Sequence, residues 1–264
     1  MIKNNPRHIA ASILNDFGIS EPQNVEIEDI AYALKIPIRY VDLGGCEGRI
    51  IHKKGQSIIT VNRSTEFESR KRFTLAHEIG HYLMHRNNLI NHNDDISSLS
   101  WFNNKNRQKI FYQEFEANEF ASELLLPTDK FISDVSGIPF SPELIRSISD
   151  KYRVSRTSTI HRFTEHGNHP ICVFYTKNNK VHYWRKSEDF KYYIKDITTQ
   201  KPPSDSVCAE YFNDNTIYSV DESKQEISKS TWLEVNEKYH DDVFYEFCLV
   251  HSSVKLAISV IWED

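Results

Sequence analysis

Residues 72–85 read RFTLAHEIGHYLMH and contain the pattern HExxH as His77, Glu78 and His81. The apolar spacing predicts a helix over residues 68–86. Two histidines four residues apart on a helix share a face and lie about 6 Å apart along the axis, so both imidazoles can bind one metal ion. Glu78 then lies beside the metal and can act as general base toward a bound water. The pattern predicts a hydrolytic zinc site, and the alternative is a core helix with two hydrogen-bonded histidines.

A catalytic zinc site needs a third protein ligand, and the next predicted helix supplies one. Residues 114–127 read EFEANEFASELLLP, which places Glu114 and Asn118 four residues apart on one face. We expect Glu114 to complete the site, as in gluzincin peptidases. We expect Asn118 to accept a hydrogen bond from a ligating histidine, more readily from His77 than from His81.

Two polar neighbours are predicted to lie outside the set of ligands. His85 extends the motif but lies about 12 Å along the axis from His77, so we expect it to pack or to hydrogen-bond around the site. The metzincin pattern overcomes that distance with a glycine, and Met84 occupies the corresponding position here. Glu116 is rotated about 200° from Glu114 and is expected to face solvent.

The two blocks together resemble the ImmA/IrrE family of zinc metallopeptidases. They match the family patterns RFTxAHExGHxxxH and ExxANxFAxxLLxP, and the resemblance covers roughly residues 6–165. It implies a zincin-like core with one Zn²⁺ held by His77, His81 and Glu114, and Glu78 as catalytic base. Relatives typically cleave a repressor of the helix-turn-helix type, which implies such a protein as partner and derepression of mobile-element, stress or defence genes as the outcome.

The length of 264 residues suits two domains, and the pattern changes near His166. We predict an α+β chain with a metallopeptidase domain over 1–166 and a β-rich C-terminal domain over 167–264. Several short strand-like runs after residue 170 support this division. Some ImmA/IrrE relatives carry a GAF-like sensory domain at this place, so the resemblance suggests a sensory or regulatory role for residues 167–264.

A pair of short helices is predicted over 142–165, and it has two interpretations. The pair closes the peptidase domain, or it forms a helix-turn-helix that contacts DNA. The second interpretation depends on five basic residues: Arg146, Lys151, Arg153, Arg156 and Arg162. We favour the first, because scattered arginines on short helices are common and the chain is acidic overall.

Other residues near the motifs are weaker candidates. Tyr112 and His92 are candidates for stabilising the transition state because they are close in sequence to the two motif helices. Cys46 would be a metal ligand in a peptide deformylase, but the flanking residues do not match that family. The strand expected over 57–62 is predicted to offer an edge to an extended peptide.

The composition narrows the remaining function classes. The formal net charge is −5, and no Gly-rich nucleotide-binding loop is present. An apolar leader and a membrane-spanning run are absent from the pattern, and four scattered cysteines suggest a reducing compartment, so a cytoplasmic protein is expected. The main alternatives to a repressor-cleaving peptidase are a non-proteolytic zinc regulator that binds DNA or the repressor, and a peptidase of loose specificity.

Overall fold

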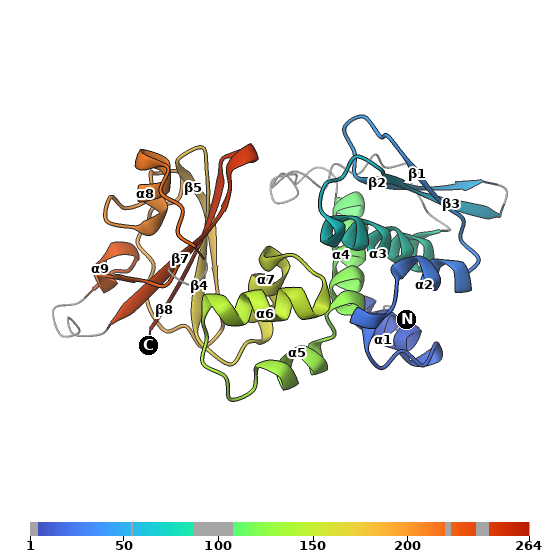
Figure 1. Ribbon diagram of the computed structural model, residues 1–264, viewed down its shortest axis with the longest axis horizontal. Coiled ribbons are helices and arrows are strands. Elements are labelled where there is room, and N and C mark those ends of the chain that lie inside the picture. The colour runs from blue at the N-terminus through green and yellow to red at the C-terminus, as the bar shows by residue number, and fades with distance from the viewer. Residues whose placement is uncertain (1–4, 54, 87–107, 220–222, 236–242, 264) are drawn as a thin grey trace. The chain divides into compact units, whose positions relative to one another are not determined.

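Groups of helices and groups of strands follow one another along the chain and build two units, each described here by itself (Figure 1). The computed structural model describes residues 5–53, 55–86, 108–219, 223–235 and 243–263. One unit is formed by Met1–Thr128 with Asp150–Ser155, and the other by Asp129–Ser149 with Arg156–Asp264. The mixture of helices and two sheets confirms the predicted α+β class. No helix among the described residues is both long and apolar enough to cross a membrane.

In the part of the chain that the structure describes, the N-terminal unit combines a small mixed sheet with four α-helices of its own. Its elements are α1 (Pro6–Asp16), the 3-10 helix η1 (Pro22–Asn24), α2 (Ile27–Ala33), β1 (Ile38–Val41), β2 (Gly48–Lys53), β3 (Gln56–Asn62), α3 (Glu68–His85) and α4 (Gln108–Leu125). The strand order is β1-β3-β2, with β1 parallel and β2 antiparallel to β3. The prediction of a free edge at 57–62 is wrong, because β3 is the central strand and pairs on both sides.

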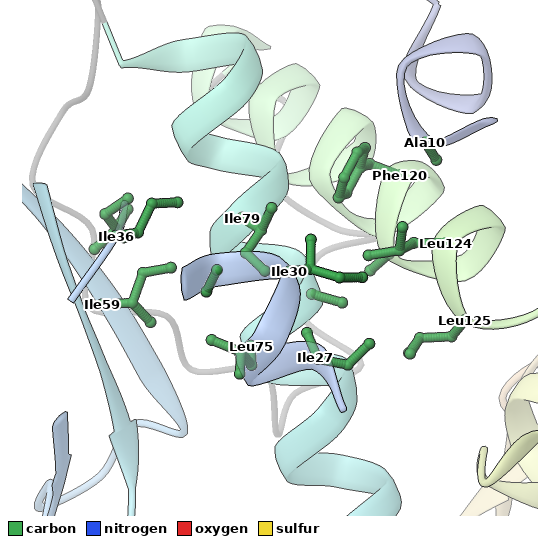
Figure 2. Packing of buried hydrophobic residues seen from close by; sticks show 14 of the residues in the cluster. Ala10, Ile27, Ile30, Ile36, Ile59, Leu75, Ile79, Phe120, Leu124 and Leu125 are labelled. Carbon is green, nitrogen blue, oxygen red and sulfur yellow. The ribbon is translucent and has the colours of Figure 1, made fainter. Parts of the chain in front are cut away.

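Helix α3 is the centre of this unit, since it packs against the sheet, against α2 and against α4. Its apolar side chains Leu75 and Ile79 belong to a buried cluster, part of which is shown in Figure 2. The cluster takes side chains from α1, α2, the sheet and α4, including Ala10, Ile27, Ile30, Ile36, Ile59, Phe120, Leu124 and Leu125. Because packing surrounds α3 on several sides, its rotation about its own axis is fixed.

A glycine lets α3 and α4 approach closely. A Cβ atom added to Gly80 would lie 3.0 Å from Cδ1 of Phe120 and 3.3 Å from the Cα of Ala117. Both partners belong to α4, and Ala117 itself carries only a methyl group. Small residues on both helices therefore bring the two backbones together at the level of the histidine motif.

Arg72 ties the first half of α3 to the start of α2. Its side chain is buried and donates to the carbonyl of Val25 and to Glu26, each at 3.2 Å. Glu26 also accepts from Arg153 at 2.6 Å, and Arg153 belongs to the short segment 150–155 that this unit includes. The hydrogen bond from Arg153, aided by both positive charges, lowers the pKa of Glu26.

The C-terminal unit is built around an antiparallel sheet. Its elements are most of α5 (Thr128–Val135) and α6 (Pro142–Tyr152), then α7 (Arg156–His166), β4 (Ile171–Lys177), β5 (Lys180–Lys186), α8 (Val207–Asp214), β6 (Gln225–Ile227), α9 (Lys229–Trp232), β7 (Phe244–His251), the 3-10 helix η4 (Ser252–Val254) and β8 (Leu256–Glu263). The strand order is β5-β4-β8-β7-β6, and every neighbouring pair is antiparallel.

Helices cover both faces of this sheet (Figure 1). On one face, Phe140 from the α5–α6 connection contacts Trp262 of β8, with ring centroids 5.0 Å apart. On the other, Trp232 of α9 stacks on Phe174 of β4 at 4.1 Å. Successive residues along a strand point to opposite faces of the sheet, so the sheet has an apolar layer on each face.

The helical pair groups with this sheet. The boundary predicted at 166/167 placed residues 142–165 with the peptidase domain, whereas the contacts group most of α6 and all of α7 with the C-terminal strands. Helix α7 packs on β4, only Arg156 and Glu165 are exposed on it, and Arg162 is 4% exposed. A recognition helix needs an exposed face, so this burial does not favour the helix-turn-helix interpretation.

Substituting Gly80 tests whether the close approach of α3 and α4 contributes to the stability of the protein. Gly80→Val adds atoms where Phe120 and Ala117 leave no room, and overpacking of this kind costs about 1–3 kcal/mol of stability. We expect that loss in denaturant unfolding followed by circular dichroism. Gly44→Val is the matched control, because Gly44 has nothing within 4 Å of its added Cβ. Equal stabilities of the two variants would show that Gly80 is not needed for the close packing of α3 and α4.

Candidate metal centre

Two helices bring three potential metal ligands to one point. His77 and His81 lie one turn apart on α3, and Glu114 projects from α4. The Nε2 atoms of the two histidines are 2.9 Å apart. Nε2 of His77 lies 3.2 Å from Oε2 of Glu114, and Nε2 of His81 lies 3.3 Å from Oε1. The three predicted ligands are therefore brought together.

These separations suit a tetrahedral metal ion. Ligand atoms about 2.0–2.2 Å from a central zinc ion lie about 3.3–3.6 Å from one another, close to the spacing seen here. Two imidazole nitrogens and one carboxylate make a donor set that zinc accepts, and three protein ligands leave a fourth position for water or substrate. Among the residues that the structure describes, this is the single group of three or more histidine, cysteine or acidic side chains arranged to hold a metal.

Two of the three side chains, His81 and Glu114, are in the protonation states that metal binding requires. Burial lowers the pKa of His81 to about 4, which leaves the ring neutral at physiological pH. Burial alone would raise the pKa of Glu114, but the nearby imidazoles of His77 and His81 hold it below its ordinary value. A neutral imidazole and an ionised carboxylate are the forms that bind a divalent metal.

Asn118 lies where the sequence placed it, one turn beyond Glu114 on the side of α4 that faces α3. Its Oδ1 is 2.9 Å from Nδ1 of His77. An amide oxygen can only accept, so Nδ1 carries the proton and donates. Nε2 of His77 is then left with its lone pair toward Glu114 and His81, as a metal ligand needs.

His85 and Glu116 also contact the site, although neither is in the ligand group. Nδ1 of His85 is 3.0 Å from Nδ1 of His81, and Nε2 of His85 is 2.9 Å from Oε2 of Glu116. His85 is buried, and burial lowers its pKa. The prediction that Glu116 faces solvent is incomplete: its side chain is 35% exposed, yet one oxygen contacts His85.

Glu78 is fully buried and lies on the side of α3 near strand β2. A Cβ atom added to Gly48 of β2 would lie 3.3 Å from Oε1 of Glu78, and it would also collide with Thr74. Gly48 thus allows the strand to pass close to the carboxylate. The sequence motifs do not include Gly48, although a glycine inside a strand often marks a close backbone approach.

The weaker candidates do not join this group. Tyr112 is 58% exposed on α4, and Cys46 is absent from the group of metal-binding side chains. The carbonyl of Cys46 accepts a hydrogen bond from Asn62. His92 lies outside the described residues.

The ligand assignment can be tested by removing one carboxylate at a time. We expect about one zinc ion per chain, because three protein donors make one open site. Glu114→Ala should weaken zinc binding strongly, since only two protein donors remain. Glu119→Ala on the same helix is the control, because Glu119 pairs with Arg7 at 2.7 Å and not with a histidine. Chelator competition measures both affinities, and equal losses would contradict the assignment.

Asn118 allows a second test. Asn118→Asp keeps an oxygen that accepts from His77, so zinc affinity should stay near that of the unaltered protein. Asn118→Leu removes the acceptor, and the loss of such a partner typically costs 10–100-fold in metal affinity or activity. Unchanged zinc binding in the folded Asn118→Leu protein would show that the hydrogen bond has no role in holding His77.

Comparison with known proteins agrees with this geometry. Residues 31–164 match the family model described as the IrrE N-terminal-like domain. Metallopeptidase ImmA of Bacillus subtilis (strain 168) is 30% identical over 132 residues, which is 48% of this chain and 66%, just under two thirds, of that relative. A Mycobacterium tuberculosis transcriptional regulator shares the fold with a TM-score of 0.63 at 12% identity, over 98% of this chain and 76% of that one. The family match covers half of the chain and contains every proposed ligand, and the chain therefore belongs to the ImmA/IrrE family of metallopeptidases.

Proposed function

We propose that the protein is a zinc-dependent endopeptidase that cleaves a transcriptional repressor of the helix-turn-helix type. The observation that carries the proposal is the convergence of His77, His81 and Glu114 on one point, with Glu78 next to His77 on the same helix. A purely structural zinc site is closed by four ligands and has no need of a carboxylate beside it. Here three ligands and an adjacent glutamate make the open, hydrolytic arrangement.

Glu78, His77 and His81 have different roles in the hydrolysis of the peptide bond. When bound, zinc acts as a Lewis acid on the scissile carbonyl and lowers the pKa of a water molecule. Glu78 accepts the proton of the attacking water and then delivers it to the amine that leaves. Burial of Glu78 keeps bulk water away from its carboxylate, which strengthens its interaction with charge that develops nearby. His77 and His81 hold their Nε2 atoms toward the reaction site.

Strand β2 supports a peptide substrate. It is one of the two edge strands of its sheet among the described strands, and its residue Gly48 lies beside Glu78. An extended peptide can add to such an edge through main-chain hydrogen bonds. The scissile bond of a peptide placed in this way would be held close to the general base.

The repressor as substrate, the cytoplasm as the place of cleavage and derepression as the outcome rest on membership of the family. Likeness to a protein titled a transcriptional regulator is consistent with this setting but concerns the fold alone. We further propose that the C-terminal unit senses a signal, as a GAF-like domain would, and its antiparallel sheet with helices on both faces supports a separate folded module. The burial of α7 supports a protein partner over DNA.

Glu78→Gln tests the proposal against a non-proteolytic zinc regulator. The amide cannot accept a proton from water, so cleavage of the proposed helix-turn-helix repressor should be abolished. Zinc content should be unchanged, because Glu78 is not a ligand. Gel electrophoresis after co-expression measures cleavage, and elemental analysis measures the metal. Glu119→Gln is the matched control and should cleave normally. Cleavage that persists in Glu78→Gln would exclude the assigned base.

A further inference from the structure

Three side chains form a continuous hydrogen-bonded series behind the metal centre. It runs from Nδ1 of His81 to Nδ1 of His85 at 3.0 Å, and from Nε2 of His85 to Oε2 of Glu116 at 2.9 Å. His81 and His85 lie one turn apart on α3, and Glu116 reaches across from α4. Beyond His81 the series leads away from the ligands, so His85 and Glu116 have no direct part in binding the metal.

The direction of each hydrogen bond follows from the chemistry of the groups. A carboxylate only accepts, so Nε2 of His85 must donate to Glu116. A neutral imidazole carries one proton, so Nδ1 of His85 is left as an acceptor. Nδ1 of His81 must then donate to it, and Nε2 of His81 keeps its lone pair. That lone pair is on the atom that faces Glu114 and His77.

We propose that His85 and Glu116 are positioning residues that fix His81 in the tautomer whose Nε2 binds the metal. The proposal rests on the metal site proposed above and assigns a role to the last histidine of the motif HExxHxxxH. His85 is only 6% exposed and both of its ring nitrogens are engaged, which a residue that merely filled space would not require.

Both ligating histidines thus donate from Nδ1, but to different partners. His77 donates directly to the neutral oxygen of Asn118. His81 donates to an imidazole that is itself bonded to a carboxylate. The negative charge of Glu116 polarises the ring of His85 and strengthens its Nδ1 as an acceptor, because hydrogen bonds in a chain reinforce one another. Removing Glu116 should therefore weaken the hold on His81 without removing any ligand.

Zinc affinity, measured by chelator competition, tests the proposal. His85→Leu removes the acceptor and should weaken zinc binding by about 10–100-fold, the usual effect of losing such a partner. His85→Asn places an amide oxygen near the former Nδ1 and should recover much of the affinity. Glu116→Ala should have a smaller effect than His85→Leu, and Glu119→Ala on the same helix should have none. A His85→Leu protein that folds and binds zinc normally would overturn the proposal, as would equal losses in the Leu and Asn variants.

Nitrogen NMR of histidine-labelled, zinc-loaded protein provides a readout that packing alone would not change. We expect His85 to be neutral and protonated on Nε2, and His81 to carry its proton on Nδ1. In Glu116→Ala, the tautomer of His85 should become mixed. A His85 protonated on Nδ1 in the unaltered protein would overturn the assignment. These measurements do not use proteolysis, so a protein that fails to cut any repressor but shows the expected order of affinities would refute the proposed substrate and leave the positioning role intact.

Discussion

The close contact between α3 and α4 is the constraint on which the candidate site depends. The two histidines come from one helix and the carboxylate from the other, so the spacing of the ligands is set by how near the backbones lie. Gly80 and Ala117 allow that approach, and the surrounding apolar cluster holds α3 from the side of the sheet and of α2. A side chain larger than hydrogen at position 80 would press against Phe120 and Ala117 of α4.

The same contact buries several polar side chains. The fold tolerates their burial because these side chains have hydrogen-bond partners. An unpaired polar group in the interior costs about 1–3 kcal/mol. Asn118 serves His77, and His85 with Glu116 serves His81. Each partner is therefore useful in folding as well as in orientation. The polar residues of α4 that contact the histidines of α3 are Glu114, Glu116 and Asn118.

Helical periodicity predicted which residues of α3 and α4 come together at the candidate site. It did not predict how the strands pair or which unit the helical pair joins. The HExxH spacing and the four-residue separation of Glu114 and Asn118 report angles around one helix axis, and these follow from the helix itself. Glu116 was expected in solvent because its angle points away from Glu114, but its long side chain reaches a histidine on another helix. The central position of β3 depends on parallel pairing with β1, and the grouping of the helical pair depends on a sheet that follows later in the chain. Both are contacts between distant segments, which local patterns do not encode.

The segment 150–155, held to the N-terminal unit through Arg153 and Glu26, has a consequence for how such proteins can evolve. The chain passes from one unit to the other near residue 128, returns near 150 and leaves again near 155. A gene fusion with one breakpoint cannot exchange the C-terminal unit alone, because a breakpoint near residue 128 also replaces residues 150–155 of the N-terminal unit. A breakpoint near residue 166 would deliver a new sheet without the helices that cover one face of it. Recombination between relatives must therefore preserve α5–α7 together with the strands, or replace both at once.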